Sequence, residues 1–238
     1  TPTNEWGVAD QYLFDFVGKR VTDDVPSFNF ILTTSNHPPY DLDLEALGFP
    51  LKALPEPLRA TKSDTLRVLG HLWYTDREAG RFVAETEQRL TAPLFAITGD
   101  HTTRLQIMFP GDSVFEQVGV PFILYGPAVL GEQRGERRTA GAHIDIAPTL
   151  YELSAPAGFP YAAFGRDLFT KPAPSYGFGD GFMIGEDLIA PWNQPGTVFG
   201  LPGIARPGEA PALAEVGRQY DALRALGWHR VRRGPNLP

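Results

Sequence analysis

The sequence contains no cysteine among its 238 residues. This absence excludes disulfide bonds, thiolate metal sites and a cysteine nucleophile, but it does not indicate a compartment, since a chain without cysteine suits any redox environment. The sequence also lacks an apolar run near the ~20 residues that a membrane-spanning helix requires. We therefore expect this chain by itself to be soluble.

Positive charge is scarce as well. The chain has 21 Lys and Arg residues against 28 Asp and Glu residues, a formal net charge of −7, and its one basic cluster is the short stretch 229–233. Proteins that follow phosphate backbones usually carry a basic surplus or a basic stripe. The charge balance argues against a nucleic-acid partner.

Glycine and proline, in contrast, are abundant. The 25 glycines and 23 prolines exceed the roughly 12% of a chain that is usual. They are frequent over residues 154–208, which we interpret as a wrapping segment with small strands and no independent core. Residues 211–226 then repeat apolar side chains at helical spacing, which predicts a peripheral C-terminal helix that ends at Gly227.

Three short apolar runs predict β-strands, at residues 27–34, 93–98 and 120–125. Their apolar residues are continuous, as in strands covered on both faces, and they do not alternate as in a half-exposed strand. This pattern is typical of central strands in a mostly parallel sheet.

Helical periodicity lies between and around these runs. Residues 62–90 predict one long helix, or two helices that meet near Gly70. Shorter stretches predict helices over 8–17 and 146–153, the second capped by Asp145. The order strand, helix, strand predicts an α/β fold with a doubly wound, mostly parallel sheet flanked by helices.

The strongest local chemical signal is Asp100 followed by His101, directly after the apolar run 93–98. Ligands of open α/β sheets gather beyond the carboxyl ends of the strands. A carboxylate oxygen beside an imidazole nitrogen suits Mn²⁺, Zn²⁺ or Mg²⁺. Two ligands do not complete a metal site, and a solvated turn fits the same two residues equally well.

His37 is a second candidate, within the sequence TTSNHPPY at residues 33–40. Hydroxyl, amide and imidazole groups follow an apolar run there and are braced by two prolines, as in a binding loop for an anionic or hydroxylated ligand. A polar turn whose side chains satisfy backbone groups is the alternative.

Four other polar residues are weaker candidates. Arg104 is suited to a phosphate group, although a surface ion pair explains it as well. His143 and Asp145 fit a structural role better than a ligand role, and His71 fits a partner within the core.

Six strings together resemble a family. They are FNFILTTSNHPPY, WYTDREAGRFVAETEQRL, LFAITGDH, GVPFILYGP, HIDIAPTLYEL and FGRDLF. Their order and spacing resemble the sulfatase-like alkaline phosphatase superfamily, and within it the lipoteichoic acid synthase type of phosphoglycerol transferase. The resemblance covers roughly residues 6–169.

The resemblance implies a division of roles among the candidates. Asp100 and His101 match two ligands of the catalytic divalent metal, which we expect to be Mn²⁺, with Mg²⁺, Zn²⁺ or Ca²⁺ as alternatives. His37 matches a histidine that contacts the substrate phosphate. The remaining ligands in the family are an acidic residue and a threonine that is also the nucleophile and forms a phospho-threonine intermediate.

That acidic residue and that threonine lie upstream of the segment that begins at Trp6, and only five residues precede Trp6 here. We therefore expect residues 1–170 to be the C-terminal part of the catalytic domain, and residues 171–238 to be its wrapping segment and terminal helix. Such a chain has no nucleophile and is inactive alone. It needs the missing N-terminal half as a partner, and its uncovered sheet edge favours self-association.

The resemblance predicts metal-dependent phosphoryl transfer on a phosphate ester of an envelope lipid or glycan. It places the parent protein at the extracytoplasmic face of the membrane, anchored there, or in the periplasm. Two alternatives stay open at this point: a sulfatase of the same superfamily, which acts on sulfate esters, and a non-catalytic module of the same fold that binds an envelope glycan.

Overall fold

The computed structural model describes residues 3–102, 113–170, 176–179, 181–192, 194, 196–203 and 213–234. Its internal contacts divide the chain into two compact units, and each is described here by itself. Among the described residues, the first unit holds 3–98 and 121–128, and the second holds 99–102, 113–120 and the residues from 129 onward. No helix within the described ranges is both long and apolar enough to cross a bilayer.

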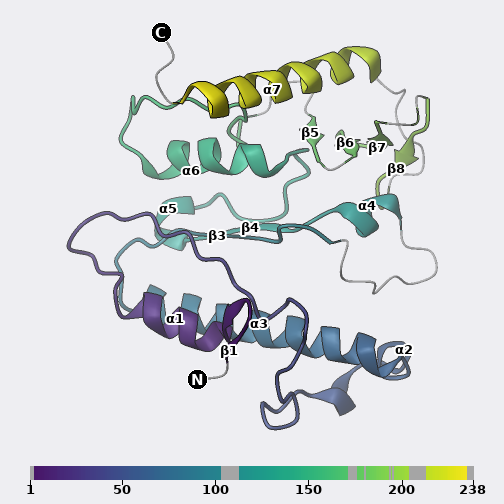
Figure 1. Cartoon of the computed structure of the whole chain (residues 1–238). Coiled ribbons are helices and arrows are strands. Elements are labelled where there is room, and N and C mark those ends of the chain that lie inside the picture. The colour runs from purple at the N-terminus through teal and green to yellow at the C-terminus, as the bar shows by residue number, and fades with distance from the viewer. Residues whose placement is uncertain are drawn as a thin grey trace. The chain divides into compact units, whose positions relative to one another are not determined.

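Two helices form the body of the first unit, α1 at Asp10–Gly18 and α3 at Ser63–Glu87. They lie side by side (Figure 1), with the rings of Phe14 and Phe82 stacked at 4.9 Å between centroids. The Arg81 guanidinium joins the two helices, since it binds Asp15 of α1 and Glu78 of α3. The 3₁₀ turn η1 at Leu51–Ala53 and the short helix α2 at Glu56–Arg59 precede α3.

Helix α3 is a single helix, which resolves the alternative of two helices meeting near Gly70. Within this helix, the Thr75 hydroxyl donates to Asp10 and the Glu78 carboxylate accepts from Arg77 and Arg81. At Gly70 a Cβ atom would lie 2.2 Å from a Leu44 methyl group. The Leu44 side chain therefore packs directly on the helix backbone at Gly70, and a larger residue there would require that side chain to shift.

The strands of the first unit correct one expectation. Two of the predicted runs form strands, β3 at Phe95–Thr98 and β4 at Phe122–Tyr125, but they pair antiparallel, with Phe95 opposite Tyr125. A continuous apolar run indicates a strand whose two faces are both covered, but it does not indicate whether the strand is parallel or antiparallel to its neighbour. An antiparallel strand at the edge of an otherwise parallel sheet is common. A short hairpin of β1, Thr3–Asn4, and β2, Gly7–Val8, lies near the N-terminus.

The third predicted strand, residues 27–34, is not formed, since no described residue pairs with it in a sheet. Every second side chain along it is apolar and exposed: Phe28 by 78%, Phe30 by 81% and Leu32 by 65%. A strand needs a neighbour for its backbone hydrogen bonds, and this run has the side chains of a buried strand without one. The first unit therefore carries an uncovered apolar surface.

The second unit contains several short helices and a small sheet. Its helical elements are α4 at Val114–Val118, η2 at His143–Asp145, α6 at Ile146–Ser154 and α7 at Leu213–Arg233, and α5 at Pro127–Leu130 leads into it. The strands β5 at Gly177–Phe178, β6 at Phe182–Ile184, β7 at Leu188–Pro191 and β8 at Phe199–Gly200 form one antiparallel sheet in sequence order.

This small sheet has a core of its own, so the expectation of no independent core for this segment was wrong. Met183, Leu188 and Ala190 are almost fully buried in it. Strands of two to four residues are too short to show a period in the sequence, which is why the pattern was missed.

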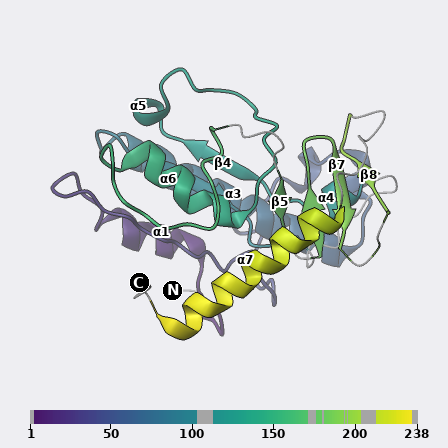
Figure 2. The ribbon, with the colours of Figure 1, turned by 90° about the horizontal axis from the view of Figure 1, so that it is seen from above.

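Helix α7 extends beyond its predicted end, since it continues through Gly227 to Arg233. A glycine inside a helix costs only about 1 kcal/mol, and the arginines of the last turn are favourably placed at the negative end of the helix dipole. Tyr220 of α7 stacks on Trp192 at 4.7 Å and lies near Phe178 of β5. Figure 2 shows α7 passing beside this sheet.

Candidate metal and substrate site

Asp100 and His101 follow the end of β3 at Thr98, and their side chains converge. The His101 backbone N–H donates to Asp100 Oδ1 at 2.9 Å, and His101 Nε2 lies 3.4 Å from Asp100 Oδ2. Both side chains are exposed. One carboxylate oxygen and one imidazole nitrogen therefore face the same small volume of solvent.

This pair fits two positions of a divalent cation's coordination sphere. Zinc usually takes four ligands, and calcium about six to eight. Within the part of the chain that the structure describes, no group of three or more His, Asp or Glu residues is placed to hold a metal. A metal site that includes Asp100 and His101 therefore stays a prediction.

The turn that carries Asp100 is held from two sides in the second unit. His143 Nε2 lies 2.8 Å from the Gly99 carbonyl oxygen, so this nitrogen carries the proton and donates. The Thr102 hydroxyl donates to the Gln117 carbonyl at 2.7 Å. His143 therefore binds the backbone beside the candidate ligands, which agrees with the structural role expected from the sequence.

Asp145 also has a structural role, although not the predicted one. Its carboxylate does not cap α6. It accepts from the backbone N–H groups of Ala142 at 2.8 Å and Arg166 at 2.9 Å, and it is buried. Asp145 thereby ties the turn of His143 to the segment of Arg166, whose guanidinium donates to the Ala140 carbonyl.

His37 lies in the first unit, in a loop with defined internal contacts. Its Nδ1 lies 2.8 Å from the Pro38 carbonyl oxygen, and its ring packs against Trp6 at 4.0 Å between centroids. Because Nδ1 donates to that carbonyl, the neutral ring has its lone pair on Nε2. The ring is thus held in one orientation by a backbone contact and an aromatic contact.

Asp10, a residue that the sequence did not single out, anchors the start of this loop. Its carboxylate is fully buried and accepts from the backbone N–H groups of Thr34 at 3.1 Å and Ser35 at 3.0 Å. It also accepts from the Thr75 hydroxyl at 2.9 Å, and the Asp10 N–H donates to the Ser35 hydroxyl at 2.9 Å. One carboxylate joins α1, α3 and the loop of His37.

His71 anchors the other end of the loop. Its Nδ1 lies 2.9 Å from the Arg67 carbonyl oxygen, and its Nε2 accepts from the Leu42 backbone N–H at 3.1 Å. Both ring nitrogens are therefore used, as expected for a histidine satisfied within the core. Burial lowers the pKa of His71 below its ordinary value of 6.5.

The lowered pKa predicts an acid-sensitive loop. The charged groups that act on His71 are Asp41, which favours its protonated form, and Arg67, which opposes it. Because the folded state resists a proton that the unfolded state accepts, the free energy of unfolding should decrease as pH falls below 6.5. Urea denaturation between about pH 7.5 and about pH 5 measures this decrease. His71→Gln should show a flatter pH dependence, and an equal slope in both proteins would contradict the assignment.

A cavity of about 380 Å³ lies in the first unit beside the loop that contains His37. The residues that line it include Thr34, Ser35, Asp41, Asp43 and Tyr74. Asp41 and Asp43 are exposed and carry negative charge. Carboxylates repel a phosphate group, so this cavity is unsuited to a phosphate and the candidate contact for one stays with His37.

Two predictions about the site concern Arg104 and the assembly of His37 with Asp100 and His101. Arg104 lies outside the described residues, so its contact with a phosphate stays a prediction. His37 belongs to the first unit, and Asp100 and His101 belong to the second. Their assembly into one site stays a prediction as well.

Comparison with known proteins places this geometry in a family. The family model described as Sulfatase matches residues 1–155, which is more than half of the chain. The chain belongs to the sulfatase family. A search among curated proteins finds no match.

A solved structure supports the fold of this sulfatase-family chain. The crystal structure of the lipoteichoic acid synthase LtaP from Listeria monocytogenes is similar, with a TM-score of 0.72 and 16% sequence identity over 98% of this chain. The likeness covers 61% of the LtaP chain, so this chain spans less than two thirds of that protein's length. The predicted α/β, sulfatase-like fold is confirmed.

Proposed function

We propose that this chain is part of the catalytic domain of a metal-dependent phosphoryl transferase that resembles a phosphoglycerol transferase. Its substrate would be a phosphate ester of an envelope lipid or glycan, at the extracytoplasmic face of the membrane or in the periplasm. The observation that carries the proposal is the convergent pair of Asp100 and His101 after β3, in a chain of the sulfatase family.

Asp100 and His101 would hold two positions on the divalent cation, for which we propose Mn²⁺. When bound, such a cation supplies charge neutralisation for a transferring phosphoryl group and a lowered pKa for a hydroxyl nucleophile. Asp100 contributes an anionic oxygen, and His101 must be neutral to coordinate. The His143 contact with Gly99 keeps the backbone under both ligands in place.

His37 would bind the substrate phosphate. A phosphate oxygen only accepts hydrogen bonds, and Nδ1 already donates to the Pro38 carbonyl. Nε2 is therefore the ring nitrogen that would contact the phosphate. Asp10 and His71 position the loop without touching the substrate.

The nucleophile and the other metal ligands would lie on polypeptide outside this chain, in the N-terminal part of the same domain. Residues 1–170 would be the C-terminal part of that domain, and residues 171–238 its wrapping segment and terminal helix. The exposed Phe28, Phe30 and Leu32 support this proposal, because further polypeptide packed against this face would cover them. In the absence of that partner, the same surface favours self-association of the chain.

The test needs the complete protein, in which this chain is joined to the segment that carries the nucleophile. Matched aryl phosphate and aryl sulfate esters should be compared with Mn²⁺ present. Turnover of the phosphate ester, with the sulfate ester left intact, supports phosphoryl transfer. The opposite preference supports a sulfatase, and binding of an envelope glycan without any turnover supports the non-catalytic module.

Replacing His37 by alanine in the complete protein should lower kcat/KM for the phosphate ester by about 10² to 10³-fold, as for the loss of one donor to a developing anion. The metal content should stay unchanged, since His37 is not a ligand in this proposal. His37→Gln retains an N–H donor and should recover part of the loss. Unchanged kinetics in His37→Ala would remove this residue from the site.

A further inference from the structure

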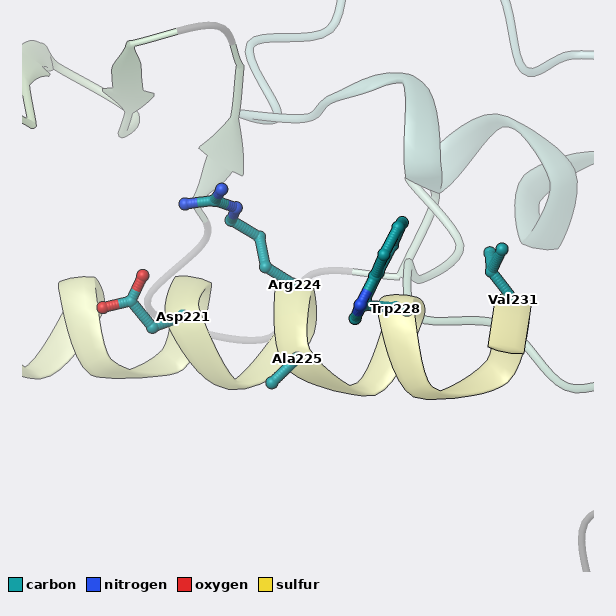
Figure 3. Close-up of a pocket in the computed structure, with 6 residues that line it drawn as sticks. Asp221, Arg224, Ala225, Trp228 and Val231 are labelled. Carbon is teal, nitrogen blue, oxygen red and sulfur yellow. The ribbon is translucent and has the colours of Figure 1, made fainter. Parts of the chain in front are cut away.

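The end of helix α7 has a surface that the proposed function does not use. Arg224, Trp228 and Val231 are spaced by four and three residues, so they share one face of the helix. Figure 3 shows them projecting from the same side of α7, with Ala225 on the other side. Trp228 is 66% exposed and Val231 is 76% exposed. They line a shallow hollow of about 530 Å³, together with residues that include the acidic Asp221, which lies about one turn before Arg224.

The charge around this face differs from that of the rest of the chain. Residues 224–233, which we name the α7 tip, include four arginines and His229 and contain no acidic residue. The chain as a whole has a net charge of −7. Arg230 lies over the ring of Phe164 at 5.6 Å, while Arg232 and Arg233 are exposed. The α7 tip thus combines exposed apolar side chains with concentrated positive charge.

We propose that the α7 tip binds the surface of a membrane that contains anionic phospholipids. Trp228 and Val231 would enter the boundary between headgroups and acyl chains, where tryptophan is favoured. The exposed Arg224, Arg232 and Arg233 would lie among lipid phosphates. Each basic side chain near an anionic leaflet increases the binding constant for the membrane about five-fold.

Charge complementarity favours a lipid surface over a second copy of this chain. A two-fold symmetric contact through the α7 tip places the same patch on both subunits, so arginines would face arginines. A lipid phosphate surface provides the opposite sign and accepts the exposed indole as well. This inference goes beyond the proposed function and does not depend on it, because lipid binding is measured without turnover.

The experiment uses the whole chain and vesicles of phosphatidylglycerol with phosphatidylcholine, with vesicles of phosphatidylcholine alone as the reference. At about 0.1 M NaCl the chain should sediment with the anionic vesicles only, and binding should weaken as salt is raised. Arg232→Gln with Arg233→Gln should weaken binding about 25-fold. Trp228→Ala should also weaken it, and circular dichroism should show that the helical content is unchanged.

A matched control changes the same charge elsewhere in the second unit. Arg134→Gln with Arg138→Gln removes two arginines whose side chains are exposed, and binding should stay within about two-fold of the original. The proposal is overturned if the chain does not bind the anionic vesicles, if it binds both vesicle types equally, or if the control variant weakens binding as much as the α7 tip variant. A dimer in light scattering that Trp228→Ala dissociates would also overturn it, in favour of a second copy.

Discussion

Alanine in place of His101 is expected to abolish turnover of the complete protein and to release its divalent cation. In the proposed site, the imidazole is one of two ligands from this chain, and Lewis-acid stabilisation by a bound metal is worth several kcal/mol. Turnover should therefore fall by at least about 10³-fold. Elemental analysis of the purified variant, together with its rate on the phosphate ester, measures both effects.

His229→Ala is the matched control, since His229 is an exposed histidine on α7 of the same unit. Its metal content and turnover should equal those of the original protein. Retention of a full metal complement by His101→Ala would show that His101 is not a ligand. Asp100 would then be the one proposed ligand left among the described residues.

Replacing Asp10 by alanine should lower the free energy of unfolding of this chain by about 3–5 kcal/mol. The carboxylate is fully buried and accepts three hydrogen bonds, and each donor that is left without a partner costs about 1–3 kcal/mol. Urea denaturation at neutral pH, where His71 is uncharged, measures the loss. The complete protein carrying this change should also lose affinity for its phosphate ester, because the loop of His37 is released.

Asp10→Asn separates loss of the hydrogen bonds from loss of the charge. The amide oxygen can still accept from Thr34 and Ser35, and the Thr75 hydroxyl can turn to accept from the amide nitrogen. We expect a loss of about 1 kcal/mol. Equal losses in the two variants would mean that the negative charge is the important property, and no loss in either would remove Asp10 as an anchor.

The helices of the first unit could be predicted from the sequence, because apolar residues repeat at helical spacing over long stretches. The predicted ranges 8–17 and 62–90 correspond to α1 and α3 within a few residues. Strand direction was not readable, since a buried strand has the same composition in either direction. The run 27–34 shows a second limit of predicting strands from local sequence. A strand forms only beside another strand, and the residues of the run do not indicate whether one is present.

The proximity of Asp100 and His101 could be predicted because they are adjacent and follow an apolar run, and their role as metal ligands stays a prediction. The distant partners of the two anchors could not be predicted, although the sequence did indicate a core partner for His71. Asp10 contacts residues 24 to 65 positions away, and His71 contacts Leu42, 29 positions away. An acidic residue in the first turn of a helix has the same appearance whether it caps that helix or holds a distant loop.

Thr75 and His71 lie one turn apart on α3, and through Asp10 and Leu42 they fasten the two ends of the same loop. We therefore expect this loop and the helix to open together, which amide hydrogen exchange would show as similar protection of the two segments. In the proposed function, the substrate would meet a loop that the fold already holds in place. The entropy cost of ordering this loop would then be small when the complex forms.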